Sequence, residues 1–184
     1  SLSKAFSSTN ANLFLLGSSD EKTARLREKL PSKKNINYFS VDLSERDSVN
    51  KFCDSVIDKY GGISVVINNA GITHDNIFMR MTDSAWDRVF AINLDASMII
   101  CKKFIRGMIK NKWGRIINIS SVVASIGNPG QSNYVAAKGA LNGLTKSMAL
   151  EVATRGVTVN CISPGFIDTA MTAKLTDDQK GKIT

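Results

Sequence analysis

The sequence predicts an α/β fold, a doubly wound parallel sheet in a single domain that spans residues 1–184. Two observations predict it. Short apolar runs alternate with segments of ten or more residues that have helical spacing, which is the order of βαβ units. The run Gly114-Arg-Ile-Ile-Asn-Ile is also apolar almost throughout, as expected for a strand that a parallel sheet buries on both faces.

In the first third of the chain, spacing and chain-breaking residues mark the elements. The first apolar run stops at Gly17, and Pro31 ends the amphipathic segment that follows, because proline cannot continue a helix. Ser44 is the expected N-cap of the next helix. The predicted elements are helix 1–9, strand 12–17, helix 20–30, strand 36–41 and helix 45–60.

The glycine pair Gly61-Gly62 separates this part from the remainder of the chain. Beyond it the apolar runs are again short, and the intervening segments are long enough for helical crossovers between parallel strands. The predicted elements are strand 63–67, helical structure over 84–110, strand 115–119, helix 132–154 and strand 157–162.

Composition narrows the class of protein. A hydrophobic fraction of 43% and a charged fraction of 22% are ordinary for a globular protein. No apolar run approaches the ~20 residues of a membrane span, and the first residues lack a signal-peptide pattern. Cys53, Cys101 and Cys161 fall in predicted helices or strands, which indicates reduced thiols and a cytoplasmic protein. The only histidine, His74, has no cysteines close by in the sequence, so we expect no metal site.

The formal net charge of +8 raises the possibility of a nucleic-acid partner. Lysines and arginines are scattered singly, however, and few aromatic residues lie between them, so nucleic acid is the weakest of the functions considered. A basic surface that faces an acidic protein accounts for the charge equally well.

The candidate for chemistry is Tyr134, which stands four residues before Lys138. On a helix this spacing places both side chains on one face. A neighbouring cation favours the phenolate, so we expect Lys138 to lower the pKa of Tyr134 and to make it an acid and base near neutrality.

Other motifs lie at fixed distances from this pair. Ser121 closes the apolar run before it, Asn93 stands in Ala91-Ile-Asn-Leu, and Pro164-Gly165 follows the last predicted strand. With N-N-A-G-I-T-H-D-N from residue 68, G-N-P-G-Q-S-N-Y to residue 134 and S-P-G-F-I-D-T from residue 163, the chain resembles the short-chain dehydrogenase/reductase family. Within that family it is most similar to the 3-oxoacyl-[acyl-carrier-protein] reductases. The resemblance extends over the whole chain and implies a Rossmann fold.

The resemblance implies a catalytic role for four residues. Tyr134 would protonate the substrate carbonyl oxygen as hydride arrives, and Ser121 would hydrogen-bond the same oxygen. Lys138 would lower the pKa of Tyr134 and bind the nicotinamide ribose. Asn93 would interrupt a helix and hold a water that connects Lys138 to solvent; a helix-packing asparagine is the alternative.

The resemblance also implies a set of cofactor contacts near the ends of predicted strands. Neutral Ser18 follows the first predicted strand, where an acidic residue would repel a 2′-phosphate, so we expect NADP(H) rather than NAD. Asn68 is expected to brace the sheet. The expected cofactor-binding residues are Ser18, Asp42, Leu43, Asn69, Ala70, Gly71, Tyr134, Lys138, Pro164, Gly165, Ile167 and Thr169.

One part of the family pattern is absent from the sequence. The family begins with a strand and a T-G-x-x-x-G-x-G turn that holds the cofactor phosphates at a helix N-terminus, and it ends with a further helix and strand. We expect a longer parent chain that carries these segments before Ser1 and after Thr184. The alternative is a truncated protein that binds its cofactor poorly.

The resemblance implies NADPH-dependent reduction of 3-oxoacyl-[acyl-carrier-protein] in fatty-acid biosynthesis, by a homotetramer. Lys112 and Arg155 match positions where the family docks the acidic carrier near the mouth of the site; ordinary solvated charges are the alternative. A reductase of another ketone or alcohol (acetoacetyl-CoA, a sugar or a steroid) and a catalytically silent nucleotide-binding subunit are the other possibilities. Ser64 and Ala170 stand where this subfamily usually has aspartate, and they weaken the assignment to it.

Overall fold

The computed structural model describes residues 2–31, 33–165 and 167. The first part of the chain is a βαβ unit. A short helix α1 (Leu2–Phe6) precedes strand β1 (Leu13–Gly17), which helix α2 (Asp20–Glu28) connects to strand β2 (Ile36–Ser40). The two strands pair in parallel, with Leu13 opposite Ile36. Ser19 is the N-cap of α2, and its side chain accepts a hydrogen bond from the main-chain N of Lys22.

The second part contains three parallel strands in the order β3-β4-β5. They are β3 (Val65–Asn68), β4 (Gly114–Ile119) and β5 (Val157–Ile162). Helix α3 (Arg46–Tyr60) connects β2 to β3. Long helical crossovers connect the three strands of this sheet. Within the described ranges, β1 and β3 are not hydrogen-bonded to each other, so the parallel strands form two sheets.

The crossover from β3 to β4 is a nearly continuous helix of three segments. These are α4 (Asp83–Phe90), the π-helical turn η2 (Ala91–Asp95) and α5 (Ala96–Lys110), and the short 3₁₀ helix η1 (Phe78–Arg80) precedes them. The crossover from β4 to β5 consists of α6 (Val123–Ile126) and the 21-residue helix α7 (Ser132–Val152).

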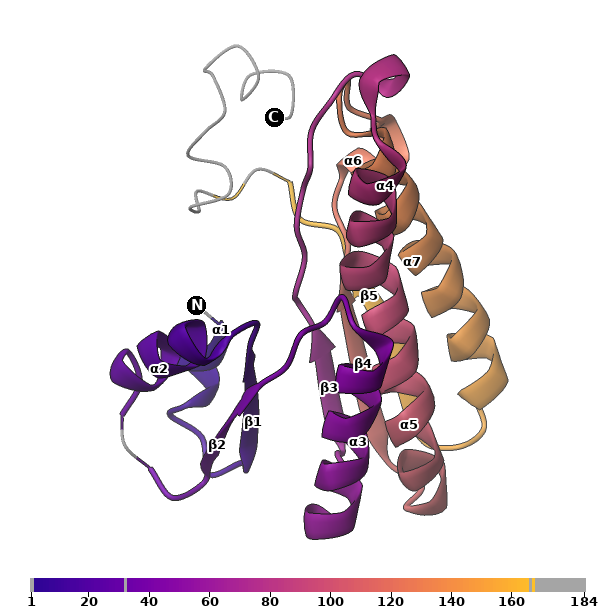
Figure 1. The fold of residues 1–184 in the computed structure, drawn as a ribbon. Coiled ribbons are helices and arrows are strands. Elements are labelled where there is room, and N and C mark those ends of the chain that lie inside the picture. Colours follow the sequence, from indigo (N-terminus) through magenta and orange to yellow (C-terminus); the bar gives the residue numbers. More distant parts are fainter. Residues whose placement is uncertain (1, 32, 166, 168–184) are drawn as a thin grey trace.

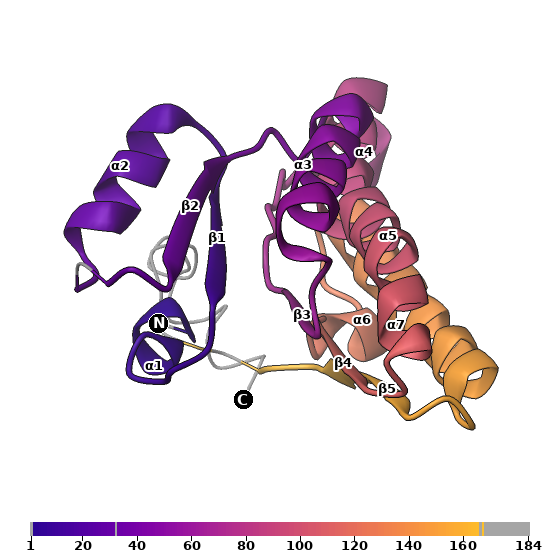
Figure 2. The same cartoon turned by 90° about the horizontal axis from the view of Figure 1, so that it is seen from below.

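The helices lie on opposite sides of the strands in the two parts of the molecule, as the doubly wound prediction requires (Figures 1 and 2). Helices α3, α5 and α7 stand on one face of the β3–β4–β5 sheet, whereas α2 lies on the far side of β1 and β2 (Figures 1 and 2). The fully buried core lies mainly beneath α3 and α5, where Val49, Val56 and Met108 pack with Ile116 of β4.

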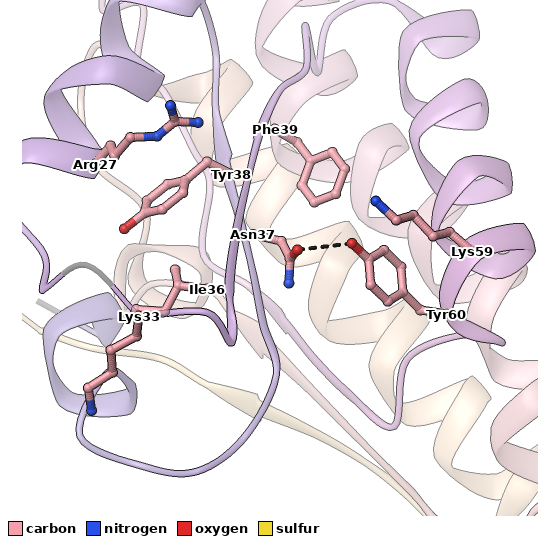
Figure 3. Close-up of a pocket in the computed structure, with 8 residues that line it drawn as sticks. All are labelled: Arg27, Lys33, Ile36, Asn37, Tyr38, Phe39, Lys59 and Tyr60. Atoms are coloured by element: carbon pink, nitrogen blue, oxygen red, sulfur yellow. Dashed lines mark hydrogen bonds between the residues drawn. The ribbon is translucent and has the colours of Figure 1, made fainter.

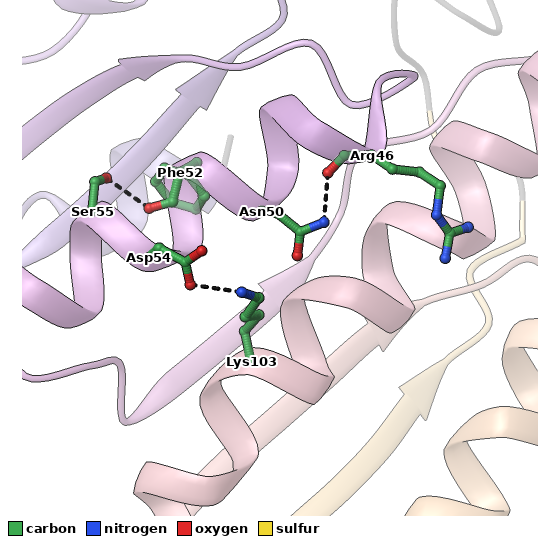
Figure 4. A network of polar contacts seen from close by, with 6 residues as sticks. All are labelled: Arg46, Asn50, Phe52, Asp54, Ser55 and Lys103. Carbon is green, nitrogen blue, oxygen red and sulfur yellow. Dashed lines mark hydrogen bonds and ion pairs between the residues drawn. The ribbon is translucent and has the colours of Figure 1, made fainter.

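The contacts of α3 join the two parts of the molecule. An aromatic cluster connects the small sheet to α3, with ring centroids 5.1 Å apart for Phe39 and Phe52 and 4.8 Å apart for Phe14 and Tyr60. On its other side, Lys103 of α5 donates to the Asp54 carboxylate at 2.6 Å (Figure 4).

Two local predictions differ from the structure. Ser44 does not cap α3: the N-cap is Glu45, and the Ser44 hydroxyl instead donates to the Asp42 carboxylate at 2.6 Å. The predicted helix over 84–110 is one crossover but contains the π-helical turn η2. None of the helices in the described part of the chain combines the length and apolar character needed to cross a membrane.

Candidate active site

The predicted site residues gather where parallel strands end. Ser121 lies two residues beyond the end of β4, Asn69 to Gly71 follow β3, and Pro164 and Gly165 follow β5. Because all three strands run in the same direction, their carboxyl ends form one edge of the sheet, which is where open α/β sheets bind ligands.

Tyr134 stands in the first turn of α7, above this edge. Its side chain is half-buried, with the side chain of Ser121 close by. Burial raises the pKa of Tyr134, the Ser121 hydrogen bond lowers it, and the negative charge of Asp75 raises it further. The prediction that Lys138 lowers the pKa of Tyr134 is therefore wrong for this structure, because loss of hydration outweighs the other influences.

Lys138 lies one turn further along α7 and is only 3% exposed. Its Nζ donates to the main-chain oxygen of Ile119 at 2.7 Å and lies 5.8 Å from the centroid of the Tyr134 ring. The ammonium thus bonds to the end of β4 and does not bond directly to the phenol. Burial lowers the pKa of Lys138 to about 8.

Asn93 is fully buried in the π-helical turn η2, so the expected interruption of the helix is present. Its side chain pairs with the main chain of Ile72: Nδ2 donates to the oxygen at 2.9 Å, and Oδ1 accepts from the nitrogen at 3.0 Å. A Cβ on Gly71 would lie 2.7 Å from this Oδ1 and 3.5 Å from the Lys138 Nζ. Only a glycine therefore fits between Asn93 and Lys138. The water that Asn93 is expected to hold stays a prediction.

A second set of contacts fixes the start of α7 against the segment after β3. Asn133 is fully buried, donates to the main-chain oxygen of His74 at 3.1 Å, and accepts from the Tyr134 main-chain N at 2.7 Å. Beside it, Gln131 donates to both oxygens of Asp75. Sequence reasoning missed Asn133 and Gln131, although both stand in the quoted motif before Tyr134.

The prediction that Asn68 braces the sheet is confirmed. Its Nδ2 donates to the Oδ1 of Asn118 on β4 at 2.8 Å and to the sulfur of Cys101 at 3.3 Å. Asn118 in turn donates to the hydroxyl of Thr145 on α7 at 2.8 Å. This buried chain of polar groups connects β3, β4 and α7 below the site.

The expected cofactor residues that the structure describes follow the same strand ends. Ser18 follows β1 and is exposed, and Asp42 and Leu43 follow β2. Two hydrogen bonds from Ser44 hold the pKa of Asp42 below its ordinary value. Thr169 lies outside the described residues. Beyond the end of β1, Lys22 Nζ donates to the Ser18 hydroxyl at 3.0 Å.

A pocket of about 440 Å³ lies elsewhere, against β2 and the end of α3. It is open rather than enclosed, and Arg27, Lys33 and Lys59 extend around it in different directions (Figure 3). Tyr60 donates to the Asn37 side chain at 2.9 Å across it. None of the predicted catalytic residues lines this pocket.

The two candidate carrier contacts lie at the opposite edge of the sheet from Tyr134. Lys112 precedes β4 and Arg155 precedes β5. The loops that carry them are in close contact, as the main chain of Lys112 lies so near Gly156 that a Cβ there would collide with it. A six-residue strand of about 17 Å separates this edge from Ser121. The expectation that these two cations line the mouth of the site on their own chain is therefore wrong.

Comparison with known proteins agrees with the geometry. The family model described as short chain dehydrogenase matches residues 1–180. The chain is 46% identical to the 3-oxoacyl-[acyl-carrier-protein] reductase of Vibrio cholerae over 142 residues, which are 77% of this chain and 58% of that protein. It is 38% identical to the reductase of the same name from Aquifex aeolicus over 183 residues, 98% of this chain and 74% of that one.

A second kind of relative also matches. Nodulation protein G of Rhizobium sp. strain N33 is 44% identical over 169 residues, which are 92% of this chain and 68% of the relative. The match to the Vibrio cholerae protein spans less than two thirds of that protein's length. Because the family match covers nearly all of the sequence and the predicted catalytic residues lie at one sheet edge, the chain belongs to the short-chain dehydrogenase family.

Proposed function

We propose that this chain reduces a 3-oxoacyl thioester carried on acyl carrier protein, with NADPH as the reductant. One observation supports the chemistry above all: Ser121 and Tyr134 lie beside each other at the carboxyl edge of the sheet, with Lys138 and Asn93 buried near them. The names of the Vibrio cholerae and Aquifex aeolicus relatives support the choice of substrate.

In the proposed reaction the bound NADPH supplies a hydride to the substrate carbonyl carbon. Ser121 and Tyr134 would both donate hydrogen bonds to the carbonyl oxygen, which orients it and stabilises its developing negative charge. The raised pKa of Tyr134 keeps the phenol protonated at neutral pH, as a general acid requires. The Tyr134 proton then passes to the oxygen, which becomes the hydroxyl of the product.

The cofactor preference rests on the neutral tip of β1. Ser18 and Ser19 carry no charge that would repel a 2′-phosphate, and Lys22 adds a cation beside them. The expected residues on β2 and β3 would contact the adenosine, and Lys138 the nicotinamide ribose. We also propose a homotetramer.

Replacing Tyr134 tests the function. Tyr134→Phe keeps the ring and removes the acid, so turnover of an acetoacetyl thioester should fall by about 10²-fold or more. Binding of NADPH, followed by its fluorescence, should stay within about threefold, because the phenol supplies little of the affinity.

Because phenylalanine retains the aromatic ring, Tyr134→Phe should fold as the unmodified protein does. Thermal unfolding of both proteins can verify this. A variant that keeps half of the turnover would contradict the proposed acid. An unmodified protein that binds NADPH but reduces neither thioesters nor other ketones would favour the silent nucleotide-binding subunit.

The carrier proposal can be tested on the basic edge. Lys112 and Arg155 are exposed neighbours at the far end of the sheet, and their part in carrier binding is what this experiment decides. Lys112→Glu with Arg155→Glu should raise KM for the carrier-linked substrate about tenfold, through lost steering and like-charge repulsion. Activity on a carrier-free thioester should not change.

The charge-neutral pair Lys112→Gln with Arg155→Gln is the matched control and should produce a smaller increase in KM. Added salt should weaken carrier-linked activity selectively, since screening acts on exposed charges. Equal losses on both kinds of substrate would mean that the substitutions damage the fold, and the docking assignment would fail.

A further inference from the structure

Ser120 lies between two residues that already have a place at the site. Ile119 before it accepts the hydrogen bond from the Lys138 ammonium, and Ser121 after it lies beside Tyr134. Ser120 itself is only 4% exposed, so its side chain cannot reach substrate or cofactor. It points into the interior, toward α7.

The buried hydroxyl of Ser120 has one partner. It donates to the main-chain oxygen of Lys138 at 3.1 Å. Consecutive residues at the end of β4 therefore hold Lys138 at both of its ends: the Ile119 oxygen holds Nζ, and the Ser120 hydroxyl holds the main chain. The Ser120 nitrogen also donates to the oxygen of Ile162 at 2.7 Å, which fixes Ser120 to β5.

This contact is not needed to complete the helix. Lys138 lies in the interior of α7, where a helical carbonyl already accepts from the amide four residues later. The bond from Ser120 is therefore an additional, lateral one. It sets the distance between the end of β4 and the turn of α7 that carries Lys138.

We infer that Ser120 is a positioning residue, whose hydroxyl holds the α7 turn so that the Lys138 ammonium stays bonded to Ile119. The effect of Ser120 on the reaction rests on the proposed function. Burial makes the hydrogen bond effective, since no water competes for its donor or acceptor. Catalytic groups lose much of their effect when displaced by about 1 Å, so one such bond can matter.

The ammonium itself provides a readout that does not depend on activity. At about pH 6, below the Lys138 pKa of about 8, Nζ is protonated. A buried ammonium bonded to a carbonyl exchanges its protons with water slowly enough for nitrogen-15 NMR. The signal can be assigned by its loss in Lys138→Met.

Ser120→Ala should accelerate this proton exchange by about tenfold or more, because the α7 turn can then move away from Ile119. Ser120→Thr keeps the hydroxyl and should restore slow exchange. Where reductase activity is measured, turnover should fall in Ser120→Ala and recover in Ser120→Thr, with KM little changed.

Thr145→Val is the matched control. Thr145 is as buried as Ser120 and stands on α7, the helix that carries Lys138. It connects α7 to β4 through Asn118. Its substitution should lower the melting temperature and leave Lys138 exchange slow. Exchange that stays slow in Ser120→Ala, or that quickens as much in Thr145→Val, would overturn the inference. A protein without reductase activity in any form would overturn the proposed function, and the exchange rates would still decide the role of Ser120.

Discussion

Burial moves the pKa values of Tyr134 and Lys138 in opposite directions, and both shifts favour the neutral side chain. Loss of hydration raises the pKa of Tyr134 and lowers that of Lys138 to about 8. Close to neutral pH the phenol therefore keeps its proton, whereas the buried ammonium is close to losing its own. At neutral pH both side chains keep their protons, as the proposed general acid and its supporting cation require.

The buried ammonium should also appear in the stability of the protein. Lys138 has a folded pKa of about 8 against an ordinary value of 10.5. Below about pH 8 the folded state carries the cost of a buried charge. Between about 8 and 10.5 the unfolded chain binds more protons than the folded one, so the free energy of unfolding should rise with pH.

We expect Lys138→Met to remove this rise and to be more stable at neutral pH by on the order of 2 kcal/mol, while losing activity. Urea unfolding of both proteins across this pH range measures the difference between their free energies of unfolding. The titration of exposed groups is common to both proteins and cancels in this difference. Parallel stability curves for the two proteins would contradict the buried charge.

At the residue scale, the sequence predicted which residues form the candidate site better than it predicted the burial and hydrogen bonds of their side chains. Tyr134 and Lys138 share one side of α7 as their spacing indicates, because helical periodicity is a local property of the chain. Ser121 comes close to them because it follows β4, whose end lies against α7. The pKa of Tyr134 could not be predicted, since it depends on burial that only the packed structure defines. The bonds of Ser120 and Asn133 were missed for the same reason: a hydroxyl or amide in a motif does not indicate which carbonyl it meets.

At the scale of single elements, the crossover from β3 to β4 carries the least predictable feature. Its helix changes to a π-helical turn at Asn93, and such turns are frequent at functional sites. The family resemblance predicted an interruption at Asn93. The pairing of its side chain with Ile72, and the need for glycine at position 71, became visible only with the fold.

Helix caps provide a test at the same scale. Ser19 accepts from the Lys22 main-chain N at the start of α2, whereas Ser44 is not the cap of α3. Ser19→Ala should lower the free energy of unfolding by about 1 kcal/mol, the usual value of such a cap. Ser44→Ala is the control and should cost less than about half of that. Chemical denaturation distinguishes the two, and a reversed order would mean that the caps are misassigned.

At the scale of the whole molecule, the parallel strands form two sheets that α3 holds together. The sheet of β1 and β2 contacts the remainder largely through the aromatic cluster of Phe14, Phe39, Phe52 and Tyr60. The predicted succession of strands and helical crossovers along the chain is confirmed, because apolar runs and long helical segments identify them. The separation into two sheets depends on hydrogen bonding between strands distant in sequence, which no local pattern records.

Phe39→Ala should therefore loosen one sheet more than the other. The substitution removes two ring contacts and should cost about 3–5 kcal/mol in the small sheet. Hydrogen exchange should quicken strongly in β1 and β2 and much less in β3, β4 and β5. Uniform acceleration over all five strands would show that the two sheets unfold as a single unit.

The separate small sheet also has a consequence for the order of folding. Its strands pair Leu13 with Ile36, whereas β3 and β4 pair Val65 with Arg115, across a much longer stretch of chain. Closing the shorter loop costs less entropy and is faster. During synthesis, β1 and β2 can pair while β4 and the tyrosine helix have yet to be made. The strands that precede Ser18, Asp42 and Leu43 would then be formed first, and the proposed proton donor would join an existing surface.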